Sequence, residues 1–361
     1  MPLRIGISTG GGDAPGLNAV IRAIVKYGVG QYHWQVVGIE DAFDGLLESP
    51  RRLQTLDLRS CKGILTLGGT ILGTSNRGDP FAYPDPDGKV TDRSAELVSA
   101  IRDEGLEGLI SIGGDGTQKI ALRLMRDHDI PVVGVPKTID NDLSATDVTF
   151  GFMSAVQAAS DALDRLHTTA EAHDRVMILE VMGRDAGWIA LQSGIAGGAD
   201  CILIPEIPYD VNRLVDKIER RRSLRRYFTI IVVAEGAVPA GGEAGASPGP
   251  SPSRRLGGGR AGVAVAEALT ERLHTDDIRV TVLGHLQRGG TPIAFDRVLA
   301  TRLGVGAVDL AQEGRWGEII CLHHDRIVGL PIEEAVAVYR TVDPDGELVR
   351  AARAVGIEFG G

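Results

Sequence analysis

Glycine-rich turns that directly follow short apolar runs are the dominant pattern of this chain. The apolar runs have strand-like composition and cover residues 3–9, 107–112, 131–135, 176–181, 228–234 and 279–283. Segments of helical period lie at residues 17–29, 116–126, 152–166, 185–195, 262–273 and 295–311. Strands that alternate with helices predict βαβ units and a parallel sheet. Because ligands bind at the carboxyl ends of parallel strands, the turns are candidate binding loops.

Length and composition narrow the class of protein. The chain has 361 residues, which suggests two domains or one large one. Its net charge of −10 argues against sequence-independent nucleic-acid binding, which depends on Lys and Arg at phosphates. Cys61, Cys201 and Cys321 are widely spaced, which argues against a disulfide framework or a zinc site and fits a reducing compartment. No signal peptide and no apolar stretch of about 20 residues is evident, so we expect a cytoplasmic protein without membrane spans.

Residues 239–262 break the strand and helix pattern. The segment consists mainly of Gly, Pro, Ala and Ser, and such a composition buries too little apolar surface to order itself. Two interpretations are open. It is a flexible surface loop or insertion, or it is a lid over a functional site.

The first glycine-rich turn reads TGGGDAPGLN at residues 9–18. Glycines let a backbone approach a ligand closely, and the following helix N-terminus offers free N–H donors to an anion. The turn is neither the G-x-G-x-x-G dinucleotide motif nor a P-loop. The alternative is a tight strand-to-helix turn that binds nothing.

The second turn reads GGDGT at residues 113–117 and the third motif reads PKTIDND at residues 136–142. Glycines of the second turn can surround phosphates, and Asp115 can hold Mg²⁺, although it could instead serve as a helix N-cap. Asp140 or Asp142 of the third motif could accept the proton of an alcohol during phosphoryl transfer. The alternative for the third motif is a turn rich in Asp and Asn.

A basic group completes the candidate residues. Arg175, Arg184, Arg279, Arg288 and His285 are predicted in or beside strand-end loops. Arg recognises phosphate in bidentate fashion, so these residues indicate a phosphorylated substrate. The alternative for each is an ordinary surface arginine. The Arg run within residues 220–226 is interpreted in this way, as a solvated helix face and its exit.

GGGDAPGLN, GGDGT, PKTIDND, EVMGRDAGW and GHLQRGGTP occur in the order and spacing of the 6-phosphofructokinases, and the chain resembles that family over residues 5–311. The resemblance implies two Rossmann-like three-layer α/β domains with the active site in the cleft between them. Residues 1–150, with a return at roughly 270–315, would bind the phosphoryl donor. Residues 151–269 would bind fructose 6-phosphate, and residues 316–361 would pack back on the domains. The implied reaction transfers a phosphoryl group to O1 of fructose 6-phosphate, giving fructose 1,6-bisphosphate.

The resemblance also implies roles for individual residues. Asp140 resembles the catalytic base, Thr138 and Asp142 would position that region and the metal–phosphate, and Arg184 would stabilise charge on the transferred group. Asp115 resembles the Mg²⁺ ligand. The residues implied at the nucleotide phosphates are Gly12, Gly114, Gly116 and Thr117. The further implied sugar-phosphate contacts are Ile139, Met182, Gly183, Glu235, His285, Gln287 and Arg288. Arg175 and Arg279 would reach a neighbouring subunit's site, which implies a homo-oligomer, a dimer or a tetramer.

The identity of the donor depends on two positions. Pyrophosphate enzymes of the family usually have Asp at position 116 and Lys at position 137, whereas common ATP enzymes have Gly at both. This chain combines Gly116 with Lys137. An Asp at 116 would stand where the α-phosphate of ATP must pass, so we expect MgATP, with pyrophosphate as the alternative. Arg77 is the expected nucleotide contact, although it is displaced by one residue, with Asn76 at the usual position.

Rival interpretations remain. NAD or lipid kinases share GGDGT, but they lack PKTIDND and GHLQRGG. A non-catalytic regulatory subunit or sensor is disfavoured because Asp115, Asp140, Asp142 and Arg184 are all present. His167 stands where family members controlled by ADP and phosphoenolpyruvate have Arg, so we expect weak or absent regulation of that kind. Activity on other sugar phosphates, such as sedoheptulose 7-phosphate, stays open.

Overall fold

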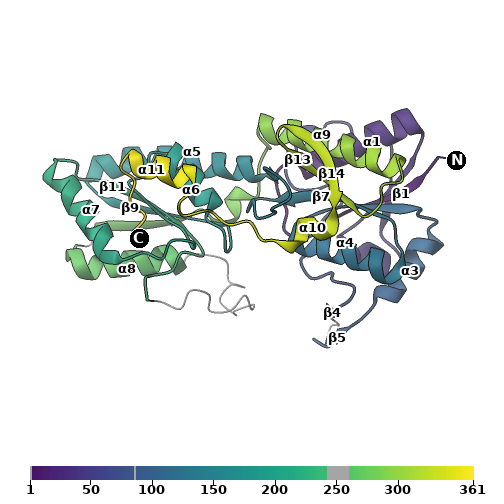
Figure 1. The fold of residues 1–361 in the computed structure, drawn as a ribbon, viewed down its shortest axis with the longest axis horizontal. Coiled ribbons are helices and arrows are strands. Elements are labelled where there is room, and N and C mark those ends of the chain that lie inside the picture. Colours follow the sequence, from purple (N-terminus) through teal and green to yellow (C-terminus); the bar gives the residue numbers. More distant parts are fainter. Residues whose placement is uncertain (1, 85–86, 242–259, 276) are drawn as a thin grey trace. The chain divides into compact units, whose positions relative to one another are not determined.

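The computed structural model describes residues 2–84, 87–241, 260–275 and 277–361. The predicted flexible insertion or lid at 239–262 falls mostly on residues 242–259, which lie outside the described residues. The chain forms two compact units, which are described separately (Figure 1). Unit 1 comprises Met1–Met153 and Arg288–Tyr339, and unit 2 comprises Ser154–Gln287 and Arg340–Gly361.

Unit 1 is built on one mixed sheet with strand order β14-β13-β7-β6-β1-β2-β3, and β8 pairs with β7. The strands are β1 (Arg4–Thr9), β2 (Gln35–Ile39), β3 (Leu53–Leu56), β6 (Gly108–Gly113), β7 (Val132–Thr138), β8 (Phe150–Gly151), β13 (Glu318–His323) and β14 (Arg326–Pro331). The central strands β13, β7, β6, β1 and β2 are parallel. The edge strands β3 and β14 are antiparallel to their neighbours.

Helices cover both faces of this sheet (Figure 1). Helices α1 (Leu17–Tyr32) and α9 (Ala294–Gln312) share one core with Ile110 and Ile112 of β6. Helices α3 (Ser94–Asp103), α4 (Asp115–His128) and α10 (Ile332–Ala337) share a second core with Leu109 of the same strand. Successive residues of a strand point to opposite faces, so β6 is buried throughout and its sequence is a continuous apolar run. Unit 1 therefore has three layers.

Unit 2 contains a parallel four-stranded sheet with strand order β10-β11-β9-β12. These strands are β9 (Val176–Val181), β10 (Cys201–Leu203), β11 (Thr229–Ala234) and β12 (Ile278–Val282). Helices α7 (Val211–Ser223) and α8 (Arg260–Leu273) pack on one face through Leu214 and Val265. Figure 1 shows α5 (Phe152–His173) and α6 (Trp188–Ala196) on the other face, and α11 (Glu347–Ala354) lies beside α6. Unit 2 is therefore also a three-layer α/β structure.

The predicted domain boundaries differ from these units. Val280 of β12 pairs with Ile178 of β9, so residues 270–287 belong to unit 2 and the return to unit 1 begins at Arg288 rather than near residue 270. The C-terminal segment also divides. Residues up to Tyr339 complete unit 1, whereas Glu358 forms a bridge with Cys201 in unit 2. A boundary of this kind depends on strand pairing, which hydrophobic periodicity does not reveal.

The interpretation of the Arg run as a solvated helix face is wrong for Arg221. Arg220, Arg221 and Arg222 form the last turn of α7. The Arg221 guanidinium forms an ion pair with Asp200, and only 12% of each side chain is exposed. The Arg221 guanidinium also donates to the carbonyl oxygen of Phe228. Arg221 thus connects the end of α7 to the residues that immediately precede β10 and β11.

Candidate active site

The first three motifs meet at one edge of the unit 1 sheet. They follow β1, β6 and β7, which are adjacent parallel strands. Thr9 pairs with Ile112 and Gly113 pairs with Pro136, so the three strands end at nearly the same level. The predicted strand at 131–135 extends through Pro136 to Thr138, which carries the start of the third motif into the sheet. This edge matches the position at which parallel sheets bind ligands.

Thr117 explains why the first two turns need glycine. A Cβ added to Gly10 would lie 2.8 Å from Thr117 Oγ1, and one added to Gly113 would lie 2.3 Å from Thr117 Cβ. Contacts this short are not tolerated, so larger residues at Gly10 or Gly113 would separate the turns. The Thr117 side chain is therefore held between the two loops.

The second turn leads directly into α4. Gly114 is the N-cap of α4 and Asp115 is its first residue, so the interpretation of Asp115 as N-cap is wrong. The Asp115 carboxylate lies 2.8 Å from the ammonium of Lys119 and stays partly exposed. Gln118 is buried and its amide donates to the carbonyl oxygens of Gly113 and Val135, which attaches the turn to β6 and β7. A helix N-terminus of this kind favours a bound anion.

The third motif is a buried turn. Thr138, Asp140 and Asp142 are all less than 9% exposed. The backbone N–H of Asp140 donates to Thr138 Oγ1 at 3.0 Å. Asn141 has a φ of 54°, and its Oδ1 accepts from the N–H of Thr149 at 3.1 Å. The motif is thus a turn rich in Asp and Asn, as the alternative interpretation predicts, and it places two carboxylates at the ligand-binding edge.

Lys137 and Arg288 connect the first turn to other motifs. Lys137 is buried and its ammonium donates to the carbonyl oxygen of Gly12. Arg288 donates to the carbonyl oxygen of Asp13 at 3.0 Å, and a Cβ on Gly12 would lie 2.8 Å from its Nη1. Two positive charges therefore lie beside the loop that is predicted to bind phosphate.

The segment with Arg77 also borders the first turn. Thr74 Oγ1 donates to the carbonyl oxygen of Gly11 at 2.5 Å, and the N–H of Gly11 donates to the carbonyl oxygen of Ser75 at 3.0 Å. Arg77 lies two residues after Ser75 and is exposed. Ile139, in contrast, is fully buried, so the structure does not expose the predicted sugar-phosphate contact at this residue.

In unit 2, a second group of predicted residues gathers at the carboxyl ends of β9, β11 and β12. The N–H of Met182 donates to Gln287 Oε1 at 2.8 Å, and the N–H of Arg184 donates to Glu235 Oε1 at 2.9 Å. Gly183 has a φ of 143°, and a Cβ there would lie 2.6 Å from the carbonyl oxygen of Ala186. The exposed His285 follows β12 at the same edge.

Arg175 and Arg279 do not join this group. Arg175 immediately precedes β9, and Arg279 is the second residue of β12. Both lie at the amino ends of their strands, so the prediction of Arg175 and Arg279 at the ligand-binding edge is wrong within their own unit. Arg279 is exposed, and its Nη1 donates to the carbonyl oxygen of Ile278.

Glu206 is a polar residue of this region that no sequence motif indicated. Its carboxylate accepts from the N–H groups of Gly187 and Val342. Burial raises the pKa of the Glu206 carboxyl, and the two backbone donors oppose that increase. The only signal in the sequence is a Glu shortly after a strand.

The carboxylate of Asp115, at the edge of the unit 1 sheet, fits a magnesium ion that is bound mainly by the oxygens of a phosphate ligand. Among the described residues, no group of three or more His, Cys, Asp and Glu side chains could hold a metal. Mg²⁺ commonly binds one or two protein carboxylates together with phosphate oxygens and water. The partly exposed oxygens of Asp115 suit such a role, and the contact with Lys119 is an exposed ion pair that a metal could replace.

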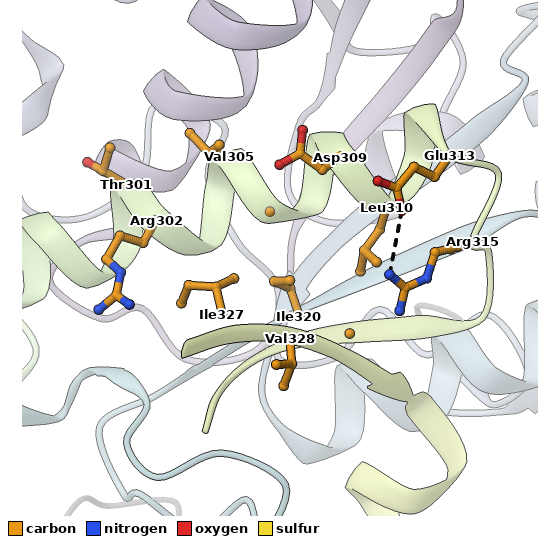
Figure 2. Close-up of a pocket in the computed structure, with 12 residues that line it drawn as sticks. Thr301, Arg302, Val305, Asp309, Leu310, Glu313, Arg315, Ile320, Ile327 and Val328 are labelled. Atoms are coloured by element: carbon orange, nitrogen blue, oxygen red, sulfur yellow. Dashed lines mark ion pairs between the residues drawn. The ribbon is translucent and has the colours of Figure 1, made fainter. Parts of the chain in front are cut away.

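A separate cavity of about 610 Å³ lies between α9 and the β13–β14 hairpin. Figure 2 shows Arg302 and Arg315 toward opposite ends of the cavity, with Val305, Ile320 and Ile327 between them. Arg315 lies 3.5 Å from Glu313. None of the residues predicted for the active site lines this cavity.

Comparison with known proteins identifies the family. Residues 4–311 match the family described as Phosphofructokinase. The chain belongs to the phosphofructokinase family. It is 52% identical over 360 residues to ATP-dependent 6-phosphofructokinase of Chloroflexus aggregans, covering 99% of this chain and 98% of the relative. It is 47% identical over 361 residues to pyrophosphate–fructose 6-phosphate 1-phosphotransferase of Streptomyces coelicolor, covering 99% and 100%.

Among solved structures, Pichia pastoris phosphofructokinase in the T-state matches with a TM-score of 0.78 and 31% identity, and the match covers 99% of this chain and 37% of that chain. The resemblance predicted from the five motifs is therefore confirmed, and so is the fold class. Within the described residues, no helix is long and apolar enough to cross a membrane.

Proposed function

We propose that this phosphofructokinase transfers the γ-phosphoryl group of MgATP to O1 of fructose 6-phosphate, giving fructose 1,6-bisphosphate. The observation that carries the proposal is the meeting of three motifs at the ends of β1, β6 and β7. Together they supply glycine turns and a helix N-terminus for phosphate, the carboxylate of Asp115 for Mg²⁺ and the carboxylate of Asp140 for the sugar hydroxyl. Phosphoryl transfer depends mainly on positioning and charge stabilisation, which these groups can provide.

Each residue has a distinct role in the proposed reaction. Asp140 accepts the proton of the O1 hydroxyl, and Thr138 holds the backbone of Asp140 through the hydrogen bond at 3.0 Å. Asp142 positions the same turn. Arg184 stabilises the negative charge of the transferred group. Mg²⁺, when bound through Asp115 and phosphate oxygens, would neutralise charge on the donor.

Gly116 supports ATP as the donor. It is the second residue of α4, and a Cβ at this position would meet nothing within 4 Å. The space beside the helix N-terminus is thus open for the α-phosphate and the nucleoside that follows it. The name of the Chloroflexus relative also favours ATP.

Pyrophosphate is the alternative donor, and two observations favour it. Lys137 places a positive charge beside the first turn, and the Streptomyces relative is named as a pyrophosphate enzyme. The open space at Gly116 is of no use to pyrophosphate, which has no α-phosphate and no nucleoside beyond its two phosphoryl groups. For this reason we favour ATP.

A direct experiment tests the reaction. Purified protein is supplied with fructose 6-phosphate, MgATP and aldolase, and triose phosphate is measured. The proposal predicts that triose phosphate forms from fructose 6-phosphate. A second assay omits aldolase and measures ADP release, and it compares sedoheptulose 7-phosphate with fructose 6-phosphate as acceptor. ADP release without fructose 1,6-bisphosphate would contradict the proposed product.

We further propose that the enzyme works in the cytoplasm as a dimer or tetramer. Arg175 and Arg279 lie away from the strand-end group of their own unit, which suits residues that serve a neighbouring subunit's site. The three cysteines form no disulfide with one another and are buried, which fits a reducing compartment.

A further inference from the structure

Glu206 links two segments of unit 2 that are far apart in the sequence. It follows β10, and its Oε1 accepts from the N–H of Gly187 at 2.9 Å and from the N–H of Val342 at 2.8 Å. Its Oε2 lies 3.2 Å from the same Gly187 nitrogen. One partly buried carboxylate therefore satisfies one N–H before α6 and another in the C-terminal segment.

Gly187 closes the turn that carries Arg184. Within this turn the N–H of Ala186 donates to the carbonyl oxygen of Gly183 at 3.0 Å, and Gly187 is the N-cap of α6. The N–H groups at a helix start have no acceptor inside the helix, and a carboxylate there is favourable. A Cβ on Gly187 would lie 2.4 Å from Ile204 Cβ and 2.8 Å from Glu206 Oε2, so the segment after β10 packs directly on the turn.

The other end of the turn has a matching carboxylate. The N–H of Arg184 donates to Glu235 Oε1, and a Cβ on Gly236 would lie 2.3 Å from the carbonyl oxygen of Arg184. Gly183 and Arg184 both have positive φ, of 143° and 53°. Glycine adopts a positive φ readily, but for Arg184 this conformation persists only where the surroundings hold it. The turn is thus held by Glu235 at its beginning and by Glu206 at its end.

The C-terminal segment strengthens the second of these attachments. Trp188 Nε1 donates to the carbonyl oxygen of Arg340 at 3.2 Å, and the Arg340 guanidinium lies 4.8 Å from the centre of the Trp188 ring. Val342, two residues later, donates to Glu206. Residues 340–342 therefore contact both Trp188 at the start of α6 and Glu206, which accepts from Gly187.

We propose that Glu206 is a positioning residue for Arg184: it holds the end of the 183–187 turn so that the guanidinium meets the transferred phosphoryl group. The inference rests on the proposed function, in which Arg184 stabilises charge in the transition state. Such a contact acts mainly on kcat, because the charge on the transferred group develops during the reaction.

The test compares three variants in the full-length protein. Glu206→Ala removes both hydrogen bonds, and we expect kcat to fall about a hundredfold, as misplacement of a catalytic group by about 1 Å can produce. The KM values for MgATP and fructose 6-phosphate should change little. Glu206→Gln should restore most of kcat, because an amide oxygen can occupy the Oε1 position that accepts both shorter hydrogen bonds.

Asp210→Ala is the matched control. It removes a carboxylate that accepts from the N–H of Asn212 in the same unit, and it should keep the wild-type kcat.

Three results would overturn the inference: a wild-type kcat in Glu206→Ala, a Glu206→Gln variant as slow as Glu206→Ala, or an equal loss in Asp210→Ala. If Glu206→Ala fails to fold, Glu206→Asp, whose carboxylate is one methylene shorter, is expected to show the same loss of kcat. Amide hydrogen exchange at residues 183–188 provides a readout that needs no activity, and it should quicken in Glu206→Ala. A wild-type protein without phosphofructokinase activity would refute the proposed function, whereas an active wild type with a normal Glu206→Ala refutes only the role of Glu206.

Discussion

The ammonium group of Lys137 donates a hydrogen bond to the carbonyl oxygen of Gly12. This contact joins the third motif to the first, although the two are separated by most of unit 1 in the sequence. It also fixes a positive charge beside the glycine turn. Because the backbone of the turn holds this charge in place, the ammonium can attract a phosphate of either ATP or pyrophosphate. Lys137 therefore does not distinguish the two donors, and we expect Gly116 to do so.

Replacing Gly116 with Asp should abolish the use of ATP. A Cβ at this position would meet nothing within 4 Å, so the variant should fold, and its carboxylate would repel the α-phosphate. Turnover with MgATP is the measurement. Gly30→Asp is a suitable control, because Gly30 is also a helical glycine with open space around it and lies in α1. Full activity with MgATP in Gly116→Asp would contradict this interpretation of the donor site.

Replacing Asp140 with Asn should lower kcat by about 100- to 10,000-fold, the usual contribution of a general base. Binding of fructose 6-phosphate, measured by calorimetry, should remain, because the amide keeps the size of the carboxylate. Asp129→Asn serves as the control, since Asp129 is an exposed residue of unit 1 with a positive φ that Asn also adopts. Turnover that survives in Asp140→Asn would exclude Asp140 as the base.

Mixing two impaired chains tests whether Arg279 serves a neighbouring subunit. Arg279→Ala should raise the KM for fructose 6-phosphate strongly, and Asp140→Asn should have the greatly lowered kcat described above. In a mixed oligomer, the Arg279→Ala chain keeps its own Asp140 and receives Arg279 from its partner. Random pairing in dimers should therefore restore about a quarter of the wild-type activity. No recovery on co-expression would show that Arg279 acts within its own chain or not at all.

We expect ADP and phosphoenolpyruvate to leave the rate nearly unchanged. His167 replaces the arginine that regulated family members have, and its Nε2 lies 2.7 Å from the carbonyl oxygen of Gly197. Its ring also packs edge-on against Phe228. The imidazole is thus engaged with its own unit. Initial rates with and without each effector, at limiting fructose 6-phosphate, provide the test, and strong activation by ADP would contradict the prediction.

The strands and turns of the candidate site could be predicted because their causes are local. Parallel strands covered on both faces are continuous apolar runs, and the predicted strand 176–181 coincides with β9. Turns that approach each other closely need glycine, as Thr117 shows for Gly10 and Gly113. Both features can therefore be recognised from short stretches of sequence.

Features that depend on distant pairing could not be predicted in the same way. The end of the first segment of unit 2, at Gln287, depends on the pairing of β12 with β9. The burial of Arg221 depends on Asp200, and the role of Glu206 depends on Gly187 and Val342. In each case the residue is ordinary in its local sequence, and only the folded chain brings its partner close.

The most direct test of the account is a single assay that compares MgATP with magnesium pyrophosphate as donors for fructose 6-phosphate. The account predicts rapid formation of fructose 1,6-bisphosphate with MgATP and little with pyrophosphate. Turnover with pyrophosphate and none with MgATP would contradict the assignment of ATP as the donor, and no turnover with either donor would contradict the proposed function.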